Sequence, residues 1–224
     1  DYYKEVLAIV EDGTTLIVDA EKDVLGVYLS GNPLEKHIED LKIFTNFGVS
    51  NLKAESTNYY KIGGRVFDVK ILYDKKQNPW AISRLECYNG FIVELFTFSD
   101  TYVKYKNYFQ NDNILYIEAE PSKKNDDDEF KVITKKIYDI SKIRKLFTNN
   151  VNIKIIFEMS NPKVIQELYD ISESFPGECG LILHIVNSTG QFEKIKSSNI
   201  LISSNQLCID TLRKKLGINN VWLS

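Results

Sequence analysis

Apolar residues in the first 60 positions of the chain recur at the spacing of an α-helix. One group consists of Val24, Leu25, Tyr28 and Leu29, and a second of Leu34, Ile38 and Leu41. Gly31 ends the first stretch, and Asn32 can cap the second because Pro33 then occupies its first position. Residues 1–60 are therefore predicted to form a helical connecting segment.

From Lys61 the apolar positions alternate with polar ones, which is typical of half-buried strands. The pattern predicts strands at about residues 62–73, 80–88, 91–98, 113–121 and 129–138, with a helix at about 100–109 between the third and the fourth. This order is that of the OB fold, a small barrel that binds oligonucleotides across strands two and three. We expect a five-stranded OB-fold β-barrel over residues 61–144, with groove loops at 74–79 and 122–128.

The last part of the chain, residues 145–224, has a different order of elements. A linker is expected at 141–150 and the first strand at 151–158, with a helix behind Asn161 and Pro162. The later elements are expected at 180–187, 192–202, 204–216 and 221–223. This predicts a small α+β domain of β-α-β-β-α-β order. A split β-α-β arrangement is the simplest packing, and other topologies with the same order stay open.

The composition indicates folded domains rather than disorder. A chain of 224 residues with 43% hydrophobic content can form two compact domains with an attached segment. It begins with Asp1 and shows no signal peptide or long apolar run, so we expect a piece of a longer, cytoplasmic protein with no membrane contact. Cys87, Cys179 and Cys208 are odd in number and widely spaced, which favours free thiols over disulfides or a zinc site.

The charge is distributed unevenly along the chain. Residues 1–60 carry 5 Lys and Arg against 11 Asp and Glu, a net −6. Residues 61–144 carry 15 against 13, a net +2, and residues 145–224 carry 8 against 7, a net +1. The middle segment is the part best suited to nucleic acid. The small excess predicts weak, salt-sensitive binding of single-stranded DNA.

No group of residues forms a recognisable catalytic or metal-binding motif. Asp126, Asp127 and Asp128 lie in an expected hairpin turn, and consecutive turn residues rarely converge on one ion. His37 and His184 are isolated, without a nucleophile in a known motif. We therefore expect no catalytic residues, no metal and no cofactor in this chain.

Basic and aromatic residues in the expected barrel are candidates for its groove. The candidate nucleic-acid contacts are Arg65, Lys70, Lys75, Lys76, Trp80, Arg84, Tyr88, Lys123 and Lys124. Trp80 and Tyr88 could stack on bases. Alternatively, Trp80 packs over the end of the barrel and the lysines keep a sheet edge soluble. Phe96 and Phe98 share a strand face with Glu94, but the helix at 100–109 could cover them, so their exposure stays open.

The string EKDVLGVYLSGNPL at residues 21–34 resembles a family pattern, E-K/R-E-x-L-G-x-Y-L-S/T-G-H-P-L/I. It precedes the OB domain in the alpha (catalytic) subunit of bacterial DNA polymerase III, and Asn32 here replaces the usual His. The stretches 64–90, 94–122 and 149–186 and the terminal NQLCIDTLRKKLGINNVWLS are also similar to that family. The resemblance spans nearly the whole chain and identifies it as similar to the C-terminal region of the subunit.

This resemblance implies a non-catalytic fragment of a DNA-directed DNA polymerase, a nucleotidyltransferase whose catalytic carboxylates lie upstream. The OB domain would contact single-stranded template. The last domain would bind the tau subunit of the clamp loader and so join the replisome. The sliding-clamp peptide of Q-x-x-L/M-F type has no match here and is expected outside this chain. Two alternatives stay open: a protein-interaction module with a spacer OB domain, and a free-standing OB-fold nucleic-acid-binding protein.

The tau-binding role is carried over to residues near the end of the chain. They are Leu212, Lys214, Lys215, Val221 and Trp222. The positive charges also suit the last turn of a helix whatever the function. Trp222 must either anchor the last strand or await a partner. Val221 and Leu223 alternate with it, so they could face the core while the Trp faces outward.

Overall fold

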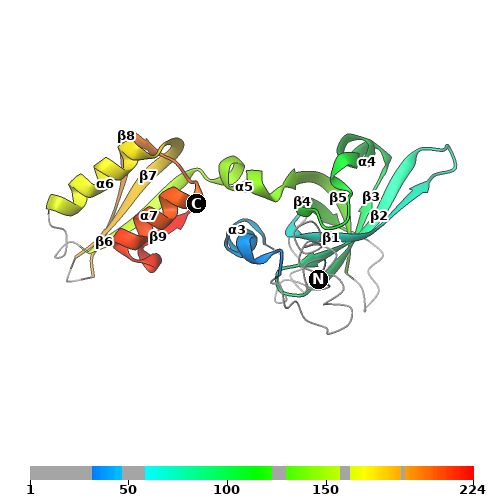
Figure 1. Cartoon of the computed structure of the whole chain (residues 1–224), viewed down its shortest axis with the longest axis horizontal. Helices are drawn as coiled ribbons and strands as arrows, with labels where there is room; N and C mark the ends of the chain where they lie inside the picture. The colour runs from blue at the N-terminus through cyan, green and yellow to red at the C-terminus, as the bar shows by residue number, and fades with distance from the viewer. Residues whose placement is uncertain (1–31, 47–58, 123–129, 157–161, 188–189) are drawn as a thin grey trace, which may run out of the picture. The chain divides into compact units, whose positions relative to one another are not determined.

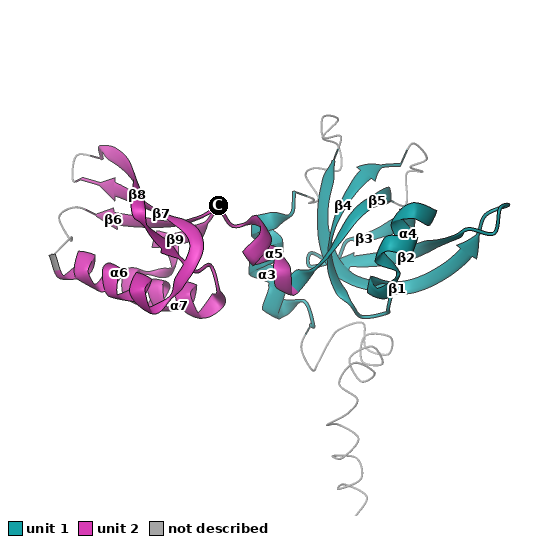
Figure 2. Ribbon diagram, turned by 90° about the horizontal axis from the view of Figure 1, so that it is seen from above, with its two compact units in different colours: residues 1–140 teal, residues 141–224 magenta. Residues whose placement is uncertain are grey.

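The computed structural model describes residues 32–46, 59–122, 130–156, 162–187 and 190–224. The chain forms two compact units, residues 1–140 and residues 141–224, each of which is described by itself (Figures 1 and 2). The helix expected before Gly31 lies outside the described residues, as do Lys123 and Lys124. Within the described ranges, no helix is long and apolar enough to cross a membrane.

A short helix precedes the barrel in the first unit. It consists of a 3₁₀ turn η1 (Glu35–His37) and helix α3 (Ile38–Phe44). The Asn32 side chain accepts a hydrogen bond from the Leu34 backbone N–H at 2.8 Å in the turn before η1, whose N-cap position is Leu34 and not Asn32 as expected. Leu34 and Leu41 are fully buried. The Leu41 side chain packs against Gly63, where a β-carbon could be placed only if Leu41 moved.

The barrel confirms the predicted OB-like fold, with strand ends within two residues of those expected. Its strands are β1 (Tyr60–Tyr73), β2 (Pro79–Cys87), β3 (Ile92–Thr97), β4 (Ile114–Pro121) and β5 (Phe130–Asp139). Helix α4 (Ser99–Tyr105) and the 3₁₀ turn η3 (Lys106–Tyr108) join β3 to β4. The barrel closes in the order β1-β2-β3-β5-β4, with β3 and β5 parallel.

Alternation along the strands separates a dry barrel interior from an outward face. Val66, Leu85, Leu95, Ile117 and Val132 point inward and are completely buried. The register of β1 against β2 shifts between Phe67 and Lys70, in a bulge where Asp68 has φ 51°. Beyond this bulge, β1 and β2 continue as a hairpin whose outer residues are exposed.

The second unit confirms the predicted β-α-β-β-α-β order. Helix α5 (Ile140–Phe147) is followed by β6 (Asn150–Ile156), α6 (Pro162–Ser174), β7 (Pro176–Val186), β8 (Phe192–Ile202), α7 (Gln206–Leu216), η5 (Ile218–Asn220) and β9 (Val221–Leu223). The four strands form one sheet in the order β8-β7-β6-β9. Helices α6 and α7 lie on the same side of it (Figure 2).

Two expectations for this unit are wrong. The linker expected at 141–150 contains α5, whose Ile140 and Ile143 are buried on one helical face. The split β-α-β packing is replaced by direct parallel pairing of β6 with β7, for example Val151 with Leu181. The β7–β8 connection is a hairpin, which places β8 on the outer side of β7 and leaves the free edge of β6 to β9.

Candidate nucleic-acid interface

Three aromatic rings lie together on the outward face of β2 and β3. Trp80 stacks on Phe96 with ring centroids 6.5 Å apart and on Phe98 with centroids 5.9 Å apart. Ala81 and Thr97, their neighbours along the strands, point inward and are completely buried, so the three rings must face out. Phe98 is 51% exposed. We call these three residues the aromatic row.

Apolar side chains continue the aromatic row across neighbouring strands. Leu72 of β1 is the pairing partner of Trp80, and Ile133 of β5 is the partner of Phe96. Leu72 is exposed and Ile133 is partly exposed. An apolar stripe therefore crosses β1, β2, β3 and β5 on the face that OB folds use for oligonucleotides.

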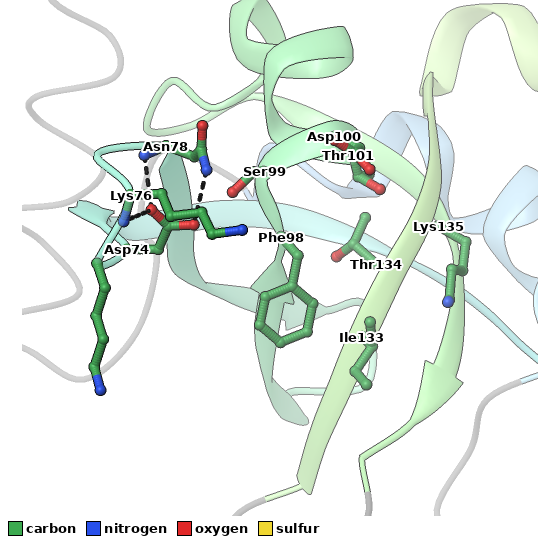
Figure 3. A pocket seen from close by; sticks show the side chains of 11 residues that line it. Asp74, Lys76, Asn78, Phe98, Ser99, Asp100, Thr101, Ile133, Thr134 and Lys135 are labelled. Carbon is green, nitrogen blue, oxygen red and sulfur yellow. Dashed lines mark hydrogen bonds between the residues drawn. The ribbon is translucent and has the colours of Figure 1, made fainter.

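The loop between β1 and β2 is held in one conformation by Asp74. Its Oδ1 accepts hydrogen bonds from the backbone N–H of Lys76 at 2.7 Å and of Asn78 at 2.8 Å, and its Oδ2 accepts one from Asn78 Nδ2 at 2.9 Å (Figure 3). The Asn78 side chain, followed by its backbone N–H, lowers the pKa of Asp74 because both stabilise the carboxylate. The loop is thus organised before any ligand binds, and it carries Lys75 and Lys76.

An open hollow of about 620 Å³ lies beside this loop. Its walls come from the loop, the start of α4 and β5 (Figure 3). The lining residues are Asp74, Lys75, Lys76, Asn78, Phe98, Ser99, Asp100, Thr101, Ile133, Thr134 and Lys135. Because Phe98 and Ile133 belong to both, the hollow and the apolar stripe form one continuous surface.

Most cations around this surface are paired with carboxylates. Lys70 lies 3.3 Å from Asp68, and Arg84 lies 3.8 Å from the same carboxylate. On β5, Lys131 pairs with Glu94 and Lys135 with Glu120, at 3.8 and 2.9 Å. Among the described residues, only the loop lysines Lys75 and Lys76 offer this surface an ammonium group without a carboxylate partner.

The structure brings together only part of the predicted groove set. Lys75, Lys76 and Trp80 border the hollow or the aromatic row, and Lys70 and Arg84 lie on the same outward strands. Tyr88 follows the opposite end of β2, roughly 25 Å along the strand from Trp80.

Arg65 is not part of the exposed surface. Its guanidinium is buried between Glu86 at 3.2 Å and Asp112 at 2.7 Å, with its side chain 7% exposed. We correct its expected place: it lies in a buried ion-pair cluster and not in the groove.

Sequence reasoning left out some residues of this surface. The sequence leaves the exposure of Phe96 and Phe98 open, and in the structure helix α4 does not cover Phe98. Lys131, Ile133 and Lys135 were not considered, although their alternation along β5 marks one strand face.

The five expected partner residues of the second unit do not form one surface. Leu212 and Val221 are in the core, at 0% and 2% exposure. Lys214 and Lys215 are exposed on α7. Trp222 is 36% exposed on a strand whose other residues face the core, as its alternation with Val221 predicted.

The three cysteines are free and buried, in agreement with the expectation of free thiols. Burial raises the pKa of Cys87 to about 12 and that of Cys208 to about 11. These thiols are therefore protonated at neutral pH and unreactive as nucleophiles. In the described parts of the chain, no three His, Cys, Asp or Glu side chains come together as a metal site would require.

The chain is similar in sequence to alpha subunits of bacterial DNA polymerase III. That of Borreliella burgdorferi is 24% identical over 209 residues, covering 91% of this chain and 18% of that protein. That of Pseudomonas aeruginosa is 20% identical over 204 residues, covering 91% of this chain and 17% of that protein. The predicted resemblance is confirmed, and the chain spans less than a fifth of the length of these relatives.

A solved structure of a mitochondrial single-stranded DNA binding protein from S. cerevisiae is also similar. It has 14% identity and a TM-score of 0.30, and the match covers 36% of this chain and 90% of that chain. No family model matches the chain.

Proposed function

We propose that this chain is the C-terminal part of a bacterial replicative DNA polymerase III alpha subunit, and that its barrel holds single-stranded template DNA. Sequence similarity over 91% of the chain supports the first statement. One observation carries the second: the aromatic row of Trp80, Phe96 and Phe98 lies open beside an organised loop with two unpaired lysines.

Stacking favours a single strand over duplex DNA. The bases of a single strand can turn toward protein rings, and each stacked base contributes roughly 1 to 3 kcal/mol. Bases in a duplex already stack on each other and cannot reach Phe98. Lys75 and Lys76 would take the phosphates that follow the stacked bases, which makes the binding salt-dependent.

The carboxylates on the same face limit the affinity. Asp68 and Glu94 would repel phosphates unless Lys70, Arg84 and Lys131 remain paired with them. The pairs of Asp68 with Lys70 and Arg84 are exposed and contribute only about 0 to 1 kcal/mol each, so a strand can rearrange them at low cost. The rings and loop lysines attract the strand and the carboxylates repel it, so we expect weak binding. Weak binding suits a template that must move.

The polymerase chemistry is assigned to the remainder of the parent protein. The relatives are more than five times as long as the matched region, and their nucleotidyl transfer needs a carboxylate cluster with two metal ions. The fragment would act without catalysis or cofactor, in the cytoplasmic replisome.

The second unit would dock on the tau subunit of the clamp loader through its helices. Large apolar side chains are exposed there: Ile165 at 50%, Tyr169 at 48% and Leu207 at 67%. Lys214 and Lys215 of α7 add charge to the same side of the sheet. If the barrel bound no DNA, the chain would act through this docking alone. It would then be a protein-interaction module in which the barrel is a spacer.

Fluorescence anisotropy of a labelled oligothymidylate tests the barrel. Trp80→Ala with Phe98→Ala should weaken binding about tenfold or more, because the rings for at least one stacked base are lost. Tyr88→Ala removes a ring at the opposite end of β2 and serves as the matched control. Circular dichroism must show that each variant is folded. Equal affinity of the double variant and the parent, or tighter binding of duplex, would sink the proposal.

A further inference from the structure

The sheet of the second unit has two faces of different character. Val151, Ile153, Leu181, Val221 and Leu223 share one face through their strand pairing and are buried, and α6 and α7 cover one side of the sheet (Figure 2). The alternate residues of the same strands face the other way, and no described helix of this unit lies on that side of the sheet (Figure 2). Residues with large or charged side chains occupy this second face.

Three aromatic rings from three strands form a line across this face. Trp222 of β9 lies with its ring centroid 4.6 Å from that of His184 of β7, and His184 lies 5.4 Å from Phe192 of β8. Phe192 is 59% exposed and Trp222 is 36% exposed, whereas His184 is buried between them. The two outer rings therefore present surface to solvent at either end of the line.

Hydrogen bonds hold this line in place. Asn152 Nδ2 donates to Ser224 Oγ at 2.9 Å, which leaves Asn152 Oδ1 to accept from His184 Nε2 at 2.8 Å. The backbone of Ser224 is bonded to Asn149 and Asn150, so the chain end does not fray. Rings fixed before binding lose less conformational entropy when a ligand stacks on them.

Positive charge surrounds the rings. Lys154 and Lys194 are the pairing partners of His184 on either side, and Lys196 is the partner of Ile182, so all three lysines share the face of the rings. All three are exposed. In the paired stretches 150–156, 182–186, 192–196 and 221–223, the only acidic residue is Glu193, whose partner Ile185 belongs to the opposite face.

We propose that this surface binds a single strand of nucleic acid, with bases stacked on Phe192 and Trp222 and phosphates on Lys154, Lys194 and Lys196. We call these five residues, together with His184, the open sheet face. Single strands are recognised in this manner on four-stranded sheets that carry exposed aromatic residues. The proposal goes beyond the groove of the barrel and uses none of its residues.

The alternative occupant of the open sheet face is a protein. Lysine is depleted at protein interfaces relative to the rest of the surface, because its mobile, strongly hydrated charge is costly to bury. Here three lysines frame the two exposed rings, and no carboxylate of the paired stretches named above shares their face. A polyanion with planar bases satisfies both features at once, and an apolar protein surface satisfies only the rings.

The chain contains two tryptophans, Trp80 and Trp222, so each unit has its own fluorescent reporter. Trp80→Phe leaves Trp222 as the only tryptophan. Titration of this variant with oligothymidylate should quench its emission saturably, with an affinity that falls as salt is added. Trp222→Phe leaves Trp80 to report on the barrel, so the two proposals succeed or fail separately.

Two further variants in the Trp80→Phe background test the contacts. Phe192→Ala should weaken the affinity about tenfold through the loss of one stacked base. Lys194→Gln with Lys196→Gln should reduce the slope of log affinity against log salt by about 1.4, because each neutralised phosphate contributes about 0.7 for a single strand. The matched control, Lys214→Gln with Lys215→Gln on α7, should leave the slope unchanged. Circular dichroism confirms folding in each case.

Emission from Trp222 that does not respond to saturating oligonucleotide overturns the proposal. Quenching that is equal in the parent, the Phe192 variant and the lysine variant also overturns it. If the Trp222 emission responds to purified tau subunit but not to the oligonucleotide, the open sheet face binds a protein, and the proposal is again overturned. Oligouridylate is titrated beside oligothymidylate: binding of either strand supports the proposal, and the ratio of affinities identifies the preferred backbone.

Discussion

The outward face of the barrel and the open sheet face of the second unit both carry a tryptophan within a row of aromatic rings. They differ in the surrounding charge. Around the aromatic row of the barrel, Asp68 and Glu94 hold Lys70, Arg84 and Lys131 in ion pairs. Around Trp222, within the paired stretches 150–156, 182–186, 192–196 and 221–223, three lysines have no acidic residue on their face.

This comparison shows that the net charge of a segment is a poor guide to its local field. Residues 61–144 carry a net +2 and residues 145–224 a net +1, which favours the barrel as the partner of DNA. Strand alternation reverses the order, because it places Glu193 on one face of β8 and Lys194 and Lys196 on the other. The second unit, which has the smaller net charge, therefore has the more uniformly positive strand face.

The largest effect is expected from Arg65, whose charge we regard as structural. Arg65→Met should lower the free energy of unfolding of the barrel by about 3 to 5 kcal/mol, because Glu86 would remain buried without its partner. Arg84→Met is the control. Its pair with Asp68 is long and partly exposed, so a loss below about 1 kcal/mol is expected. Urea denaturation followed by Trp80 emission in the Trp222→Phe background measures both. If Arg65→Met lowers the free energy of unfolding only slightly, the charge of Arg65 is not structural, and Arg65 becomes a candidate phosphate contact again.

The next effect concerns the support of Trp222. Asn152→Ala removes the acceptor of the His184 Nε2 hydrogen and should cost the second unit about 1 to 3 kcal/mol, since the buried donor is left unpaired. Ser224→Ala removes only a hydroxyl at the exposed chain end and should cost clearly less. Denaturation of Trp80→Phe variants, followed by Trp222 emission, compares the two. Equal costs would mean that the hydrogen bond to His184 adds no stability.

The positions of helices and strands along the chain were predictable from the sequence, but which elements pack against each other was not. Alternation located the five barrel strands within two residues, because one face of each strand is buried. The same alternation cannot tell which strand lies beside β6, so the adjacency of β6 and β7 was missed. The spacing of Ile140, Ile143 and Phe147 did contain the helical signal for α5.

The candidate site was predicted less well than the fold for the same reason. Arg65 finds its partners 21 and 47 residues away along the chain, a distance at which no sequence pattern operates. The exposure of Phe98 depends on how α4 packs, and the lysines of the open sheet face depend on strand register. The place of Lys75 and Lys76 in the loop between β1 and β2 was predictable because a turn depends on neighbouring residues alone.

The pH dependence of the second unit should report on His184. Burial, and to a lesser extent the charge of Lys194, lowers the pKa of His184 below its usual 6.5. The unfolded chain therefore binds a proton first as the pH falls. Stability should be level above pH 6.5 and should decline below it, down to the pKa of the folded state.

His184→Gln should remove this decline. The only other histidine, His37, lies in the first unit and does not enter the comparison. Thermal unfolding of the second unit, followed by Trp222 emission between neutral and mildly acidic pH, measures the slope. An identical slope in His184→Gln would assign the pH dependence to other groups.

The smallest effect on stability is expected for the loop lysines, which makes them the cleanest test of charge in the barrel groove. Lys75→Ala with Lys76→Ala should change the free energy of unfolding by less than about 0.5 kcal/mol, because both side chains are exposed and Asp74 holds the loop through backbone and Asn78 contacts. The slope of log affinity against log salt should fall by about 1.4 when Trp80 reports on oligothymidylate binding. Lys70→Ala, which removes a cation already paired with Asp68, should change the slope by less than either loop lysine does. An unchanged slope in the double variant would mean that the loop lysines only keep the hairpin soluble, and that stacking alone accounts for the binding by the barrel.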